Sequence, residues 1–275
     1  MSTDDLTIRR LGDFAHVDAG DAVDMVGRLD AMHALDAFQA YKRETFDQLR
    51  PAPGKRLADL GCGTGGDAGK LIGRVQPGGS VTGFDISEAM LTQARERHGQ
   101  VDGLDFVKID ASGLDAPDDS FDGIRADRVL IHVPDPRATL AEMIRVTKPG
   151  GRIVISEPDM PGCWVASDNY PLTDRIMAEI AKSCISPYFA RDLYPTFKST
   201  PGLKDISFSI WSLTAFDPAS VSKILDLSGV VESMYSRGLI SPGEVEEVLT
   251  DFTARGRDGR FVASAPVMVA AATKA

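Results

Sequence analysis

The 275-residue sequence predicts an α/β protein with a doubly wound sheet, and two observations support this fold class. First, short apolar runs alternate with segments of helical spacing between residues 56 and 157, which is typical of parallel strands joined by helices. Second, the first apolar run opens into a glycine-rich loop at residues 61–66. Such a loop, placed between a strand and a helix, lets the backbone approach a bulky ligand.

Composition and net charge argue against several classes of binding partner. The net charge is −10 and no run of five like charges occurs, which argues against nucleic acid as a partner and against stable binding to an anionic membrane. Cys62, Cys163 and Cys184 form no Cys/His array, so nothing indicates a metal site and a reducing compartment fits. No window reaches the roughly 18 consecutive apolar residues of a membrane span. We therefore expect a cytoplasmic protein.

The first half of the chain reads as a helical arm followed by a core. Residues 1–50 are expected to form an N-terminal arm or lid, because apolar positions recur at helical spacing from residue 21 to 49. Residues 51–158 are expected to form the ligand-binding core. Its strands are predicted at 57–60, 80–85, 104–110, 121–130 and 152–157, and its helices at 67–75, 87–98 and 136–146.

The residue composition of the chain changes after Pro158. Residues 159–201 contain many aromatic side chains and five prolines, and the segment is too long for a simple connection, so a helical cap insertion is predicted. Residues 202–275 are expected to complete the sheet. They supply a sixth strand at 205–213, a helical insert at 218–255 and a final strand at 260–270.

The glycine loop alone leaves two ligands open. Gly61-x-Gly63-x-x-Gly66 fits the dinucleotide fingerprint, and Asp85 lies where that fingerprint places its ribose-binding acid. The neighbouring Asp59, however, would repel a pyrophosphate and attract a cationic ligand. On the glycines alone, NAD and a cationic nucleoside both remain compatible.

The segment from Asp59 to Gly65 resembles the first motif of the class I S-adenosylmethionine (SAM) dependent methyltransferases, and the resemblance extends over about residues 41–158. It implies a Rossmann-like sheet of seven strands, parallel except for one antiparallel edge strand. It also implies SAM as the cofactor. Residues of the loop would wrap the methionine and ribose of SAM: Asp59, Gly61, Cys62, Gly63 and Gly65.

The resemblance also implies which residues hold the rest of SAM. Asp85 would bind both ribose hydroxyls, since two carboxylate oxygens match a vicinal diol, although Asp85 could instead only cap the next helix. Ile86 and Met90 would lie beside the adenine. Asp110 would accept from the exocyclic amine and the Ala111 N–H would donate to the ring. Together with Asp59, the Asp110-Ala111 pair favours SAM over NAD.

Phe121 to Pro136 closely resembles the strand-four segment of the ubiquinone/menaquinone C-methyltransferase-like branch. By this resemblance the Ala126 carbonyl would hold the SAM ammonium, while Asp127 and Arg128 would face the methyl group or line its pocket. Arg128 is bulkier than that pattern leads us to expect. The preceding Arg43 stands where the branch has an arginine and could clamp the SAM carboxylate, but a solvated basic helix turn explains it equally well.

Methyl transfer from a sulfonium is an in-line displacement, in which a general base contributes only if the acceptor must lose a proton. Candidate bases are His132, Asp127 and His33, and a structural role is the alternative for both histidines. Five aromatic side chains in and after the insertion are candidates for an acceptor pocket, with ordinary core packing as the alternative. They are Trp164, Tyr170, Tyr188, Tyr194 and Trp211.

We therefore predict a SAM-dependent methyltransferase whose partner is a small organic acceptor, either a secondary metabolite or a quinone-like molecule. One alternative is a SAM-binding protein of the cyclase type that does not methylate. Another is an NAD-dependent oxidoreductase, which Asp59 and Asp110 disfavour. The sequence does not fix the acceptor, the atom that is methylated or the oligomeric state, and it is compatible with a homodimer.

Overall fold

A mixed sheet forms the frame of the computed structural model, which describes residues 22–109 and 113–275. Within these residues the sheet has eight strands. They are β1 (Arg56–Leu60), β2 (Ser80–Asp85), β3 (Leu104–Lys108), β4 (Phe121–Asp127), β5 (Thr147–Pro158), β6 (Trp164–Val165), β7 (Leu203–Ala215) and β8 (Ala263–Lys274).

The sheet places the ends of its central strands at one edge. Strands β3, β2, β1, β4 and β5 are neighbours in this order and are parallel. Leu57 of β1 lies between Val81 of β2 and Gly123 of β4. Because carboxyl ends of parallel strands meet at the same edge, the loops after β1, β2 and β4 converge there.

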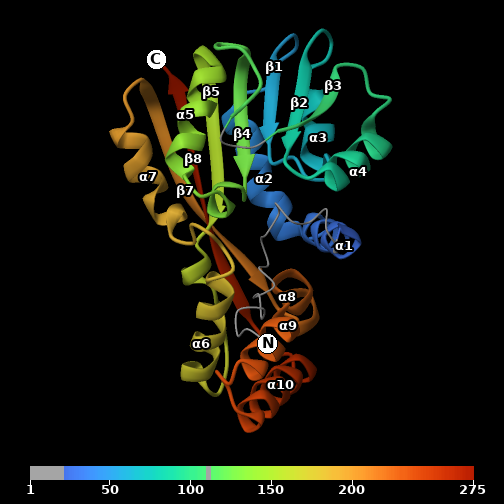
Figure 1. The fold of residues 1–275 in the computed structure, drawn as a ribbon, viewed down its shortest axis with the longest axis vertical. Coiled ribbons are helices and arrows are strands. Elements are labelled where there is room, and N and C mark those ends of the chain that lie inside the picture. The colour runs from blue at the N-terminus through green and yellow to red at the C-terminus, as the bar shows by residue number, and fades with distance from the viewer. Residues whose placement is uncertain (1–21, 110–112) are drawn as a thin grey trace, which may run out of the picture.

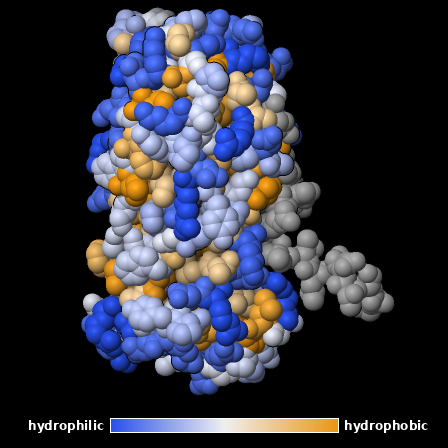
Figure 2. All heavy atoms as spheres, turned by 90° about the vertical axis from the view of Figure 1, so that its left-hand side faces the viewer, coloured by the Kyte–Doolittle hydropathy of each residue, from blue (hydrophilic) through white to orange (hydrophobic). Residues whose placement is uncertain are grey.

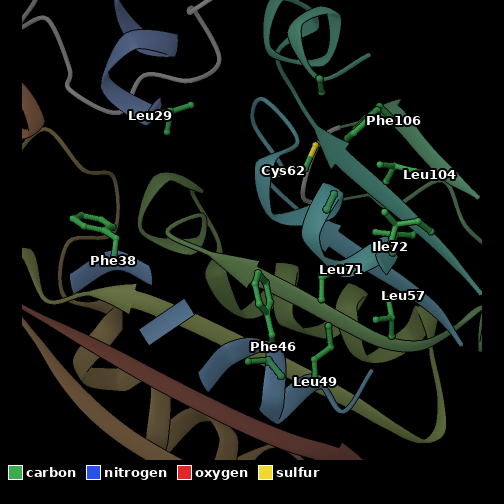
Figure 3. Packing of buried hydrophobic residues seen from close by; sticks show 14 of the residues in the cluster. Leu29, Phe38, Phe46, Leu49, Leu57, Cys62, Leu71, Ile72, Leu104 and Phe106 are labelled. Carbon is green, nitrogen blue, oxygen red and sulfur yellow. The ribbon is translucent and has the colours of Figure 1, made fainter. Parts of the chain in front are cut away.

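Helices cover both faces of this sheet. On one face lie α2 (Asp36–Leu49), α3 (Gly66–Val75) and α4 (Glu88–His98), and the other face carries α5 (Pro136–Val146) and α7 (Phe189–Ser199). Figure 3 shows the first of these two layers, in which Phe46 and Leu49 of α2 and Leu71 of α3 pack near Leu57. Buried apolar side chains of this kind supply most of the folding free energy of such a layer.

A second lobe lies beyond the carboxyl edge of the sheet (Figure 1). It contains α6 (Tyr170–Ala181), α8 (Pro218–Leu225), α9 (Leu227–Ser236) and α10 (Pro242–Arg257), which share a separate apolar cluster. The long strands β7 and β8 run from the sheet into this lobe (Figure 1). The first helix, α1 (Ala22–His33), packs against α2, α4 and α8 and so lies between the two lobes.

The predicted α/β class and doubly wound sheet are confirmed. The strand count is eight rather than seven in the described part of the chain, because the two-residue β6 pairs with β8 beyond the end of β5. The antiparallel strand β8 is not at the edge, since β7 pairs along its other side. The segment 159–201 divides between the lobes, because α6 joins the second lobe while α7 packs on the sheet.

In the face that Figure 2 shows, apolar side chains form separate patches between polar ones. No helix among the described residues combines the length and the apolar character that a bilayer span requires.

Candidate functional site

The glycine loop after β1 adopts a conformation that only glycine accepts easily. Gly61 and Gly65 have φ values of +68° and +78°, a region that disfavours residues with a Cβ atom. A Cβ on Gly61 would lie 2.2 Å from Cγ2 of Val129, and one on Gly65 would lie 2.7 Å from the ring of Phe106. The loop is therefore fixed by close packing against Val129, in the turn after β4, and against Phe106 of β3.

Asp85 connects this loop to the next helix. One of its carboxylate oxygens accepts a hydrogen bond from Gly63 N at 2.8 Å, and the other accepts from Ser87 N at 2.9 Å. Ser87 in turn caps α4 by accepting from Met90 N. Ile86 is half-buried and Met90 is buried beside it. Both interpretations of Asp85, as helix-capping group and as part of the loop site, thus agree with the structure.

The predicted adenine-binding pair, Asp110 and Ala111, lies outside the described residues. Their assignment therefore stays a prediction.

A buried cluster of charged side chains lies directly behind the glycine loop. Lys42 of α2 forms ion pairs with Asp67 of α3 and, at 3.1 Å, with Asp127 of β4. Arg125 of β4, only 1% exposed, pairs with Asp59 at 2.9 Å and with Asp67 and Asp127 at 3.0 Å each. These contacts join two helices and two strands through three carboxylates and two cationic groups.

The cluster shifts the acidity of its carboxyl groups in opposite directions. Burial would raise the pKa of Asp127, but Lys42 and Arg125 hold it well below its usual range. The same two cations outweigh burial at Asp67 and lower its pKa to about 2. Burial dominates at Asp59 and raises its pKa to about 6, although Arg125 acts against this. All three groups are predominantly ionised at neutral pH.

Asp127 is held by neutral groups as well as by ions. Ser156 Oγ donates to it at 2.7 Å, and the hydroxyl of Tyr41 donates at 3.1 Å. A carboxylate with a low pKa and this many donors is a weak proton acceptor. The structure therefore argues against the predicted role of Asp127 as general base.

A cavity of about 40 Å³ lies between the glycine loop, the charged cluster and α1. It is lined by Leu29, His33, Lys42, Asp59, Gly61, Cys62, Gly63, Thr64, Asp67, Arg125, Asp127 and Arg128. Helix α1 closes it, since Cδ1 of Leu29 would lie 3.4 Å from a Cβ on Gly63. Ligand sites of drug-sized molecules usually measure about 300–1,000 Å³, so the cavity is in a closed state.

Four buried polar atoms of residues in the wall of this cavity lack a hydrogen-bond partner among the described residues. One of them, Nη2 of Arg125, still forms ion pairs with Asp67 and Asp127, which leaves three. They are the hydroxyl oxygen of Thr64, the carboxylate oxygen Oδ1 of Asp67 and Nε of Arg128. A buried polar group without a partner costs about 1–3 kcal/mol. Because such groups normally find a partner, these three indicate that a polar ligand completes the site.

The two candidate histidines occupy different places. His33 lines the cavity, and its Nε2 lies 3.0 Å from Lys42 Nζ. An ammonium group can only donate, so the lone pair of His33 Nε2 accepts this hydrogen bond. Burial, and then Lys42, lower the pKa of His33 to about 4. His132 lies in the 3₁₀ helix η2 (Leu130–His132), is not a lining residue, and has a pKa that burial and then Arg128 lower to about 3.

The structure corrects the assignment of Arg43. Its side chain is exposed on the outer side of α2, whereas the adjacent Lys42 is buried at the cavity. The buried positions of α2 recur at helical spacing and include Phe38, Tyr41, Lys42 and Thr45. One residue of a helix advances the side chain by about 100°, which turns Arg43 away. Ala126 is fully buried in β4, as expected for a strand in the centre of the sheet.

The five aromatic side chains predicted for an acceptor pocket do not converge. Tyr170 and Tyr188 are 57% and 59% exposed, and Trp164 is exposed on β6. The ring of Tyr194 packs against Phe208 with centroids 5.3 Å apart, and the indole N–H of Trp211 donates to Glu44 of α2. None of the five lines the cavity at the glycine loop. The division of 159–201 between two lobes separates them.

The second cavity, of about 510 Å³, lies in the helical lobe between the start of α6 and α10. Its wall is acidic, but Asp168 and Asp251 are already paired with Arg255, and Glu247 accepts from the amide of Asn169. The larger cavity is therefore not lined by a glycine-rich loop, and none of its described lining residues has a buried side-chain polar atom that lacks a hydrogen-bond partner. We place the functional site at the smaller cavity.

Comparisons with known proteins agree on one family. Residues 51–193, just over half of the chain, match a family model described as a methyltransferase domain. An uncharacterized 37.1 kDa protein of a Streptomyces fradiae transposon is 44% identical over 136 residues, which cover 50% of this chain and 39% of that protein. The demethylmenaquinone methyltransferase of Clavibacter sepedonicus is 37% identical over 151 residues, which cover 55% of this chain and 60% of that protein.

A solved structure extends the similarity to nearly the whole chain. Phosphoethanolamine N-methyltransferase 2 of Haemonchus contortus, in complex with phosphomonomethylethanolamine and S-adenosylhomocysteine, has a TM-score of 0.61 at 18% identity. The alignment covers 97% of this chain and 60% of that one, and it shows a shared fold. The chain spans less than two thirds of the length of the two relatives described above and of this neighbour.

We predict that Lys42 and Arg43 differ sharply in their effect on stability. Lys42→Met leaves Asp67 and Asp127 with less compensation in a buried site, which should lower the free energy of unfolding by about 3–5 kcal/mol. The matched control Arg43→Met, at an exposed position, should change it by less than about 0.5 kcal/mol. Urea unfolding at neutral pH measures both. Equal losses in the two variants would contradict the buried cluster.

Proposed function

Because the chain belongs to the family of methyltransferase domains, we propose that it binds SAM at the glycine loop and transfers its methyl group to a small organic acceptor. The observation that carries the proposal is the set of unpartnered polar atoms in the cavity wall. A carboxylate oxygen of Asp67 and a guanidinium N–H of Arg128 are an acceptor and a donor. These two atoms match the ammonium and the carboxylate of a methionine group.

The charges of the site support a cationic ligand without phosphate. The cluster behind the loop has three carboxylates against two cations that pair with them. Arg128, the remaining cation of the wall, lies against Met32 and the ring of Phe38 instead. A sulfonium near the carboxylates gains Coulomb energy, whereas a pyrophosphate would be repelled. This supports SAM over NAD as the cofactor.

Asp85 is the proposed ribose ligand. Its two oxygens accept from backbone N–H groups in this structure, and a carboxylate oxygen can accept more than one hydrogen bond, which is compatible with binding a ribose hydroxyl. Asp59, Gly61, Cys62, Gly63 and Gly65 supply the remaining loop contacts, as expected from the sequence.

Bound SAM supplies an electrophilic methyl group, and the chain has to exclude water from it and align the acceptor in line with the breaking bond. None of the three predicted bases suits proton abstraction. Asp127 is held by cations, the lone pair of His33 faces Lys42, and His132 lies away from the cavity wall. We therefore propose that positioning dominates and that the acceptor reacts as an anion or an activated carbon.

The acceptor is proposed to be quinone-like or another small metabolite. The name of the Clavibacter relative, a demethylmenaquinone methyltransferase, supports the first choice. Its alignment covers just over half of this chain, so the region that would recognise the acceptor remains a proposal. The helical arm, including α1, is proposed to act as the lid of the site.

The first test is direct binding. Titration calorimetry with SAM should give saturable binding, and NADH should give none. Asp85→Ala removes two hydrogen-bond acceptors from the loop, and each lost charged hydrogen bond costs about 1.5–3 kcal/mol, so SAM affinity should fall at least tenfold. Asp102→Ala, at an exposed position, is the matched control. NADH binding, or Asp85→Ala with unchanged SAM affinity, would refute the assignment.

A second test concerns the lid. Because the closed cavity of about 40 Å³ is too small for SAM, we expect helix α1, which covers it, to change its position when SAM binds. Hydrogen–deuterium exchange should therefore change in peptides that cover 25–33 on addition of SAM, with peptides of α5 as the internal control. SAM binding with no change in α1 would show that the cavity opens elsewhere.

A third test concerns the base. His132→Asn should alter kcat by less than about tenfold, whereas removal of a general base costs about 10²–10⁴-fold. The measurement is formation of S-adenosylhomocysteine with an acceptor obtained from a screen of quinols and phenols. A loss of a hundredfold or more in kcat with intact SAM affinity would restore His132 as the base.

A further inference from the structure

Glu157, near the end of β5, is fully buried and takes no part in the proposed chemistry. Successive residues of a strand point to opposite faces, so Glu157 shares the face of Ile153 and Ile155, which pack with α5 and α7. The neighbouring Ser156 points to the other face, where it donates to Asp127.

The contacts of Glu157 hold the turn that follows β4. Its Oε1 accepts from Val129 N at 3.0 Å and from Leu130 N at 2.7 Å. Its Oε2 is buried and has no hydrogen-bond partner within the described residues. Burial raises the pKa of Glu157 to about 8, despite the two N–H donors. The carboxyl group is therefore mainly protonated at neutral pH, which reduces the cost of burying it.

The turn held by Glu157 forms one wall of the cavity. Val129 lies so close to Gly61 that no side chain fits between them. Arg128 has a left-handed backbone, with φ of 59°, a conformation that persists only when neighbouring contacts enforce it. The N–H of Arg128 donates to Ser156 O at 2.8 Å. A displacement of this turn would therefore move both the glycine loop and the unpartnered Arg128 Nε.

We propose that Glu157 is a positioning residue of the cofactor site: through Val129 and Leu130 it sets the turn that packs on Gly61 and presents Arg128 to the cavity. This inference rests on the proposed function, because it assigns the purpose of the turn to SAM binding. Amide exchange at Val129 and Leu130, measured together with SAM affinity, distinguishes this positioning role from packing alone.

Three groups on neighbouring segments influence the ionisation of Glu157. Asp127 on β4 opposes it, Arg128 after β4 favours it, and the thiol of Cys184 between α6 and α7 is a further titratable neighbour. The folded state binds the proton of Glu157 more tightly than the unfolded state does. This group therefore stabilises the fold at low pH, and its contribution is lost as pH rises toward about 8.

Other shifted groups also contribute to the pH dependence of stability. Burial lowers the pKa of His33 to about 4 and that of His132 to about 3, so both histidines make the fold more stable as pH rises through 6.5. Asp59, whose pKa burial raises to about 6, acts in the opposite direction. These contributions are common to the wild type and Glu157→Gln, so the difference between the two proteins from about pH 6.5 to pH 8 is assigned to Glu157.

The experiment compares Glu157→Ala and Glu157→Gln with the exposed control Glu232→Ala. In ligand-free Glu157→Ala, the amides of Val129 and Leu130 should exchange with deuterium about tenfold faster, and the Kd for SAM should rise about tenfold, as loss of these hydrogen bonds implies. Glu157→Gln keeps an acceptor oxygen and should retain wild-type exchange and affinity. Between about pH 6.5 and pH 8 the urea midpoint of the wild type should fall relative to that of Glu157→Gln.

The exchange rates and the SAM affinities together decide whether Glu157 positions the turn. Unchanged exchange in Glu157→Ala, or faster exchange with unchanged SAM affinity, overturns it. If Glu157→Ala does not fold, Glu157→Met, which also lacks the acceptor oxygens but keeps the length of the side chain, replaces it in the exchange and affinity measurements with the same deciding outcomes. Wild-type protein that does not bind SAM refutes the proposed function, whereas normal wild-type binding with an unaffected Glu157→Ala refutes only the role of Glu157.

Discussion

The structure depends on the buried ion pairs that Lys42 and Arg125 form with Asp59, Asp67 and Asp127. Charges removed from water are costly unless they are well paired, so α2, α3, β1 and β4 can pack only in the arrangement that brings these five side chains together. The same arrangement places the glycine loop over the cluster. Fold and site are thus specified by one set of contacts, and the charge state of the cluster at neutral pH also determines which ligands the cavity can accept.

The ion pairs of the cluster explain why Asp127, a carboxylate in the cavity wall, is unsuited to accept a proton. Lys42, Arg125, Ser156 and Tyr41 all act on Asp127. Interactions that stabilise an ionised carboxylate lower its basicity by the same free energy. A group that orders the site therefore cannot also be a strong base. This separation is compatible with methyl transfer, since that reaction depends chiefly on alignment and exclusion of water.

Local patterns in the sequence predicted the fold class and the glycine loop, because strand periodicity and glycine conformation are local properties. The sequence analysis did not predict the buried charged cluster, although one part of it could have been predicted from helical periodicity. The period that buries Tyr41 and Thr45 of α2 also buries Lys42 and exposes Arg43. The pairing of Arg125 with Asp67 joins positions 58 residues apart in the chain, and it follows from tertiary packing. Glu157 likewise becomes significant only when β5 places it behind Val129 and Leu130.

The five aromatic side chains do not gather at the glycine loop, and the reason bears on how an acceptor reaches the site. A cap formed by 159–201 would have to fold over the glycine loop, but the loop is covered by α1 instead. Helix α1 is bound to both lobes, through Asp30 to Arg97 of α4 and through Arg28 to Asp226 before α9. Met25 and Val26 pack against the core together with Trp211 and Leu213 of β7. Movement of α1 would uncover this apolar surface, which is unfavourable in water. In the proposed function, movement of α1 to admit the cofactor would therefore also expose apolar side chains beside the site.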